Sequence, residues 1–118
     1  MDPRIGHKKR MSVKHAKSLK DMISKIIDMK HSDRLLYLRD LNDVEFKLIQ
    51  EIVINFMQKN LKTPPETFHE LQKIKDFMRA FVSCKNSKKR KRALLTTLKG
   101  LRMVALLLPV LNLFLNNV

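Results

Sequence analysis

The sequence contains very little of the chemistry on which most enzymes and secreted modules depend. It has one cysteine, Cys84, two glycines and no tryptophan among 118 residues. A single cysteine excludes an internal disulfide framework and a cysteine-rich zinc module, so secretion is not indicated. Residues 1–30 are basic throughout and do not resemble a secretory leader. Two glycines leave little room for phosphate-cradling loops.

Catalytic motifs are also missing. There is no Gly-x-Ser-x-Gly and no His-Glu-x-x-His motif. The four histidines, His7, His15, His31 and His69, stand at separations that no common metal motif uses. Cys84 is expected to be a small, half-buried filler. We therefore predict a protein that is not an enzyme and that has no catalytic residue, cofactor, metal or small-molecule substrate.

The residues that are abundant favour helices. Hydrophobic residues make up 44% of the chain, as in globular proteins. Leu, Lys, Met and Ile are frequent, and they favour helix over sheet. Together with the length of a single domain, this predicts an all-α fold, a small helical bundle of about four to six helices with a flexible basic N-terminal arm.

Apolar residues recur at three- and four-residue steps in several segments, which is typical of amphipathic helices. The first helix is expected to begin after Ser12 as its N-cap, and others to cover residues 34–41, 44–59 and 65–82. Asn42 and Ser87 are expected N-caps, Thr63 with Glu66 an expected capping box, and Gly100 a helix stop. The predicted organisation is an arm at 1–11, a helical domain at 12–82 with a neutral core at 31–82, and a basic-then-apolar helical segment at 83–118.

Positive charge gathers at the two ends of the chain. Residues 1–30 carry nine Lys or Arg and three Asp, residues 31–82 carry eight basic and eight acidic residues, and residues 83–118 carry eight basic residues and no acidic one. Like charges repel and oppose folding, so folding alone does not require this pattern. A polyanionic partner explains it. The expected nucleic-acid contacts are Arg4, Lys8, Lys9, Arg10, Lys14, Lys17, Lys20, Lys25, Lys85, Lys88, Lys89, Arg90, Lys91, Arg92, Lys99 and Arg102.

The pattern favours duplex DNA over single strands. Base stacking on single strands needs aromatic residues among the basic ones, whereas residues 1–30 have none and residues 83–118 have only Phe114. Duplex binding through counterion release needs only clustered cations. Five consecutive basic residues, 88–92, suit phosphate contact rather than base recognition, and they also match a nuclear import signal.

The C-terminal segment allows other partners. A basic stretch followed by an apolar one is typical of a segment that lies in an anionic membrane interface. The residues expected to contact a membrane or a protein partner are Leu106, Leu107, Leu108, Leu111, Leu113, Phe114 and Leu115. With Gly100 as a stop, the apolar stretch 103–115 is too short to span a bilayer. A capsid-associated interaction protein, a homo-oligomer and simple core packing remain open alternatives.

Several short motifs follow one another between residues 41 and 115. They are Asn55, the turn at residues 59–64, Leu71, Lys73, Lys75, Arg79, the basic run at 87–91, Leu94-Leu95, Lys99-Gly100 and the Leu-Pro segment at 105–111. In order and spacing they resemble a family of small basic proteins encoded by Polinton/Maverick-type elements and adintoviruses. Gly100 stands alone where this family has a glycine pair, Lys62 lies where a Gly-Asn-x-Pro turn is usual, and residues 1–30 have no counterpart.

The resemblance implies a minor virion component, similar in character to the small basic core proteins of adenoviruses, which condense DNA or disturb membranes. Combined with the charge pattern, it predicts a sequence-independent DNA-binding and condensing protein of a virus-like element. Its expected location is the nucleus of the host cell and the virion. The alternative is a membrane-active entry protein that acts through residues 88–118.

Overall fold

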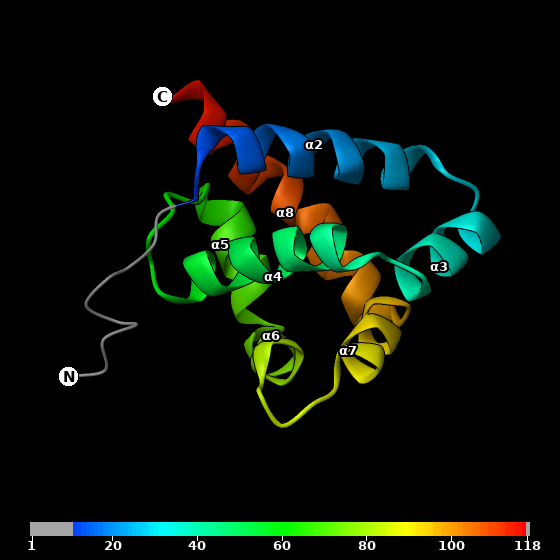
Figure 1. Ribbon diagram of the computed structural model, residues 1–118. Coiled ribbons are helices and arrows are strands. Elements are labelled where there is room, and N and C mark those ends of the chain that lie inside the picture. The colour runs from blue at the N-terminus through cyan, green and yellow to red at the C-terminus, as the bar shows by residue number, and fades with distance from the viewer. Residues whose placement is uncertain (1–10, 118) are drawn as a thin grey trace.

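The structure, a computed structural model, describes residues 11–117 and places them in seven helices without a strand (Figure 1). The helices are α2 (Val13–Asp28), α3 (His31–Arg39), α4 (Asp43–Met57), α5 (Pro65–Gln72), α6 (Lys75–Val82), α7 (Lys88–Leu95) and α8 (Leu98–Asn116). The all-α prediction is confirmed, with one helix more than expected. The arm contacts expected at Arg4, Lys8, Lys9 and Arg10 lie outside the described residues.

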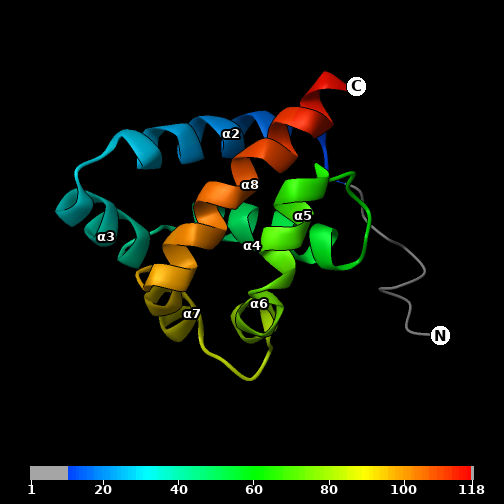
Figure 2. The ribbon, with the colours of Figure 1, turned by 180° about the vertical axis from the view of Figure 1, so that it is seen from behind.

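Helix α8 is the centre of the bundle. It packs against α2, α5, α6 and α7, while α4 packs against α2 and α6. In Figures 1 and 2, α2 lies across one end of the molecule and α6 and α7 lie side by side at the other end, with α4 and α8 between them. The two segments that flank the neutral middle of the sequence therefore meet in one fold.

One hydrophobic core unites these helices. Leu19 and Ile23 of α2, Phe46 of α4, and Leu107 and Leu111 of α8 are all at most 1% exposed. The middle segment, about fifty residues by the sequence analysis, is near the lower limit for a self-sufficient core. The apolar faces of the first helix and of the C-terminal segment supply what it lacks, which is one of the alternatives that the sequence leaves open.

Three helices begin at the N-caps that the sequence predicts. The side-chain oxygens of Ser12 and Ser87 each accept a hydrogen bond from the backbone N–H three residues later, at 3.1 Å. Asn42 forms a capping box with Glu45 at the start of α4. A cap of this kind contributes about 1 kcal/mol, so these serines and this asparagine define where the helices start.

The capping box predicted at Thr63 and Glu66 is wrong. Pro64 occupies the N-cap position of α5, and no side chain caps the helix. A residue before proline is held in an extended conformation, which is the conformation of Pro64 before Pro65. The helix begins at Pro65, as expected, but its N-cap is Pro64 and not Thr63. The Thr63 hydroxyl donates instead to the carbonyl of Leu61 at 3.4 Å.

Two helix ranges also differ from the prediction. Residues 65–82 form two helices, α5 and α6, because the chain bends at Ile74, whose backbone φ is −115° and ψ is 23°. The bend lets α5 pack on α8 while α6 packs on α4 and α7, and continuous apolar spacing does not reveal it. Helix α3 begins at His31 rather than at Arg34. The Arg34 guanidinium donates to the carbonyls of Ile26, Ile27 and Met29 at the end of α2.

Gly100 does not stop a helix. It lies in the first turn of α8, where its N–H donates to the hydroxyl of the N-cap Thr97 at 3.1 Å. A Cβ at this position would lie 2.2 Å from the carbonyl oxygen of Leu94 and 2.6 Å from the Cα of Leu95. The glycine is therefore needed for the close approach of α8 to the end of α7.

As a consequence α8 is continuous over 19 residues. By length and composition alone it is the one helix of the described part that is long and apolar enough to cross a membrane. The prediction that the apolar segment is too short to span a bilayer is therefore wrong, because it took Gly100 as a helix stop. Two further details differ from the sequence analysis: Cys84 is exposed rather than half-buried, and Met11, expected in the arm, is buried in the core.

Candidate nucleic-acid interface

The densest group of exposed cations lies on α7 and on the loop before it. Lys85, Lys88, Lys89 and Arg90, here called the α7 patch, are all exposed. Lys85, Lys89 and Arg90 form no ion pair with any residue in the described range, and Lys88 lies 4.0 Å from the nearest Asp43 carboxylate oxygen. Helix α7, which carries most of the patch, lies beside α6 at one end of the molecule (Figure 1).

Arg92 belongs to the predicted set but serves the fold. Its guanidinium donates to the backbone carbonyl of Leu41 at 2.7 Å and to the Asp43 carboxylate at 2.8 Å, and its carbon lies 4.9 Å from the centre of the Phe46 ring. Only 16% of the side chain is exposed. Arg92 thus fastens α7 to the start of α4, and it is not free to contact a phosphate.

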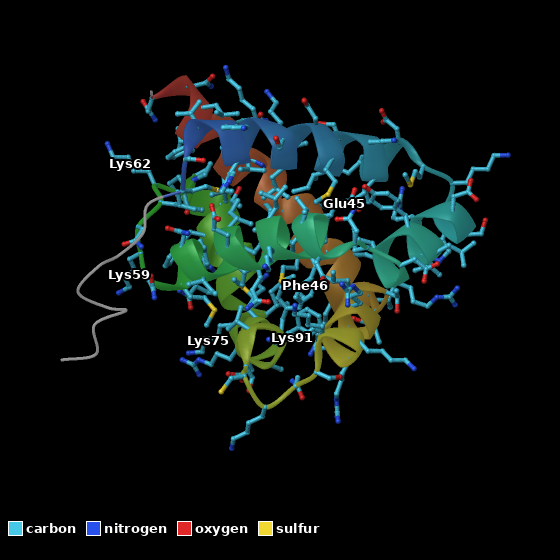
Figure 3. All side chains as sticks on the ribbon, in the orientation of Figure 1. Glu45, Phe46, Lys59, Lys62, Lys75 and Lys91 are labelled. Atoms are coloured by element: carbon cyan, nitrogen blue, oxygen red, sulfur yellow. The ribbon has the colours of Figure 1, made fainter. Side chains whose placement is uncertain are left out.

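Lys91 is also largely withdrawn from the surface. Its residue is 6% exposed, and Figure 3 places it between α6 and α7. Every fully buried polar side-chain atom in the described residues has a hydrogen-bond partner. The Lys91 ammonium has none among these residues, although the backbone N–H of Lys91 donates to the carbonyl of Ser87 at 2.9 Å. Its ammonium therefore reaches solvent at the end of a buried aliphatic chain, as long cationic side chains commonly do.

The anchoring of α7 has a pH dependence. The hydrogen bond from Arg92, followed by the charge of Lys88, holds the pKa of the Asp43 carboxyl below its usual range. Because the pKa of Asp43 is lower in the folded state than in the unfolded state, its ion pair stabilises the fold fully above the unfolded pKa, about 3.9. This stabilisation is lost as the pH falls through the folded pKa. We expect an NMR titration of the Asp43 carboxyl to have a lower midpoint in the wild type than in Arg92→Gln. Equal midpoints would show that this ion pair does not form in solution.

The remaining C-terminal cations differ from each other. Lys99 is exposed in the first turn of α8, close in sequence to the end of α7. Arg102 forms an ion pair with Glu70, and Lys73 contacts the same carboxylate at 2.8 Å. These two cations, with the hydrogen bond from Lys73 as the largest cause, hold the pKa of Glu70 below its usual range. Arg102 therefore links α8 to α5, whereas Lys99 is available to a partner.

The lysines of α2 differ in exposure and in their acidic neighbours. Lys14 and Lys17 are exposed in its first half, which has no acidic residue. Lys20 is half-buried, and Lys25 lies one helical turn from both Asp21 and Asp28. Residues three and four apart are neighbours on a helix surface. The cationic part of α2 is consequently its beginning.

Two lysines that the sequence analysis did not select lie near this end. Lys59 and Lys62 are exposed in the loop between α4 and α5, and this loop runs beside the start of α2 in both ribbon views (Figures 1 and 2). Figure 3 shows both lysines at the edge of the molecule, directed away from it. Neither has an ion-pair partner among residues 11–117. Lys14, Lys17, Lys59 and Lys62 are here called the α2 patch.

The placement of charge on the helix starts is unusual in α2, α7 and α8. The N-terminus of a helix carries a partial positive charge and favours acidic side chains. The first turns of α3, α4, α5 and α6 each contain an acidic residue, whereas those of α2, α7 and α8 contain none and carry lysines instead. Like charges converge there at some cost in stability, and a bound anion would relieve it.

The residues predicted to contact a membrane or protein partner lie mainly inside the fold. Leu107 and Leu111 are fully buried, and Leu106, Leu108, Phe114 and Leu115 are partly buried against the core. Leu113 is half-buried. The more exposed surface of α8 is its first turn, where Leu98 is 85% exposed. The apolar half of the C-terminal segment thus packs in the core, which is one of the alternatives that the sequence left open.

Comparison with known proteins finds no family model, no curated protein and no solved structure that matches the chain. Within residues 11–117 no group of three or more His, Cys, Asp or Glu side chains is arranged to hold a metal ion. The resemblance to proteins of Polinton/Maverick-type elements stays a prediction. The distribution of cations over the fold is the observation on which a function can be argued.

Proposed function

We propose that this protein binds and condenses duplex DNA without sequence specificity, as a minor core component of a virus-like element. The observation that carries the proposal is the α7 patch. Its four cations, Lys85, Lys88, Lys89 and Arg90, are exposed around a helix start that contains no acidic residue. This clustering of like charges does not stabilise the fold, whereas a phosphate backbone would neutralise the charges.

The structure supports phosphate contact rather than base recognition. Proteins that recognise bases in the major groove place several side chains of one helix face against the base edges. In α7 the inward side holds Lys91 and Arg92 against the bundle, so the exposed cations form a short arc of three residues. Such an arc matches phosphates along one strand and carries no sequence information.

The proposal predicts the binding behaviour of the full chain. Duplexes of the same length but unrelated sequence should have equal Kd values, measured by fluorescence anisotropy at a fixed salt concentration. Single strands should bind more weakly, because the charge density along the axis is lower and the described aromatic residues do not accompany the α7 patch. A preference for one duplex sequence would contradict the proposal, and so would an absence of DNA binding.

Membrane activity through residues 88–118 is the second candidate, favoured by the length and apolar character of α8. In this fold it requires α8 to leave the core, because Leu107 and Leu111 are fully buried. Leakage of anionic liposomes accompanied by a loss of tertiary structure would support it. A capsid protein or a second copy of the chain remains a proposed partner for the intact fold.

A further inference from the structure

We infer that the protein bridges two DNA duplexes, with the α7 patch on one and the α2 patch as a second binding surface on the other. This inference rests on the proposed function and adds to it the means by which a single chain condenses DNA. A protein with one cationic surface coats a duplex, whereas one with two separated surfaces holds duplexes together.

The two patches lie at different ends of the molecule. α2 lies at the top of Figure 1 and α7 at the bottom, and Figure 2, turned about the vertical axis, keeps this order. The α2 patch combines the beginning of α2 with the loop between α4 and α5, and Figure 3 places Lys62 near the start of α2 and Lys59 lower, level with α4. α4 and α8 lie between the two ends. One straight duplex that contacts the α7 patch therefore passes at a distance from the α2 patch.

The α2 patch has the charge that a second duplex requires. Lys14, Lys17, Lys59 and Lys62 come from two separate elements and are all exposed. Within the described range none of them forms an ion pair; the ion pair that α2 makes joins His15 to Glu51 of α4 at 3.1 Å. Four unneutralised cations on one end of a small molecule form a surface that fits a phosphate backbone.

Repulsion between the two duplexes does not prevent bridging. The shortest principal dimension of the molecule is 27 Å, and charges are screened over about 8 Å at physiological ionic strength. Two duplexes at opposite ends of the protein are therefore separated by several screening lengths. The two helices between them, α4 and α8, together contain three acidic and three basic residues and act as a spacer without net charge.

Fluorescence cross-correlation tests this inference with the full chain. Two short duplexes of the same sequence carry different dyes, and the protein is added below one copy per duplex. We expect the wild type to make the two dyes diffuse together. A variant with Lys14, Lys17, Lys59 and Lys62 changed to Gln should bind a single duplex through its α7 patch but reduce the cross-correlation to the level of DNA alone.

A control variant has three exposed cations outside both patches, Lys30, Arg39 and Lys47, changed to Gln, and it should bridge as the wild type does. Sedimentation equilibrium of the protein without DNA counts its copies, because a dimer with one site per chain would also bridge. Bridging by the α2-patch variant equal to that of the wild type would overturn the inference. Binding of the wild type without cross-correlation would overturn it and leave the proposed function standing, whereas no binding at all would overturn both.

Discussion

Replacing Leu107 by Asp is expected to unfold the protein. Leu107 lies fully buried in the middle of α8, the helix that packs against α2, α5, α6 and α7. Truncating a buried leucine costs about 2–5 kcal/mol, and burying an unpaired carboxylate adds several kcal/mol. The sum approaches or exceeds the free energy of unfolding of a typical small domain, about 5–15 kcal/mol. Circular dichroism should show a loss of helix or a strongly lowered Tm.

The control for this experiment is Leu98→Asp in the same helix. Leu98 is 85% exposed, and an acidic residue in a first turn interacts favourably with the helix dipole. We expect its Tm to equal or slightly exceed that of the wild type. If Leu107→Asp instead kept the wild-type Tm and only abolished liposome leakage, α8 would be a membrane-active segment and not the centre of the core.

The second large effect is expected at the α7 patch. Changing Lys85, Lys89 and Arg90 to Gln should weaken duplex binding by at least about tenfold at moderate salt, since up to three phosphate contacts are lost. The fold should be unaffected, because these side chains are exposed and form no ion pair with the described residues. Fluorescence anisotropy gives the Kd, and circular dichroism gives the helix content.

The matched control removes the same charge elsewhere. Lys30, Arg39 and Lys47 are exposed on the α3 and α4 side of the molecule, so their change to Gln lowers the net charge equally. These side chains lie outside the α7 patch, where screening weakens their attraction to the DNA, and we expect a smaller loss of affinity. Equal losses in the two variants would mean that net charge, and not the α7 patch, determines binding.

The fold class could be predicted from the sequence because helix periodicity and capping are local properties. Ser12, Asn42 and Ser87 carry their capping signal in their own side chains, and the structure confirms all three. The bend at Ile74 and the close approach at Gly100 were not predictable. Both follow from how helices distant in sequence pack, and Gly100 has the same local signature as a helix stop.

The candidate site was predicted in part for a similar reason. A run of basic residues shows how many cations are present but not which way their side chains point. The predicted DNA contacts therefore include Lys91, which is buried, and Arg92, which bonds to the Leu41 carbonyl. Lys59 and Lys62 were missed because eight acidic residues bring the net charge of their segment to zero. Their exposure in the loop beside α2 becomes evident only in three dimensions.

The salt dependence of duplex binding by the full chain tests whether the α7 patch contacts DNA phosphates. Deleting residues 83–118 is not a suitable comparison, because it removes α8 and with it the core. The measurement is the slope of log K against log salt from about 50 to 300 mM for the wild type and for the variant with Lys85, Lys89 and Arg90 changed to Gln. We predict a steep wild-type slope that becomes shallower by about 0.9 for each lost contact, up to about 2.7 in total. A flat wild-type slope, or one that the substitutions leave unchanged, would contradict the account.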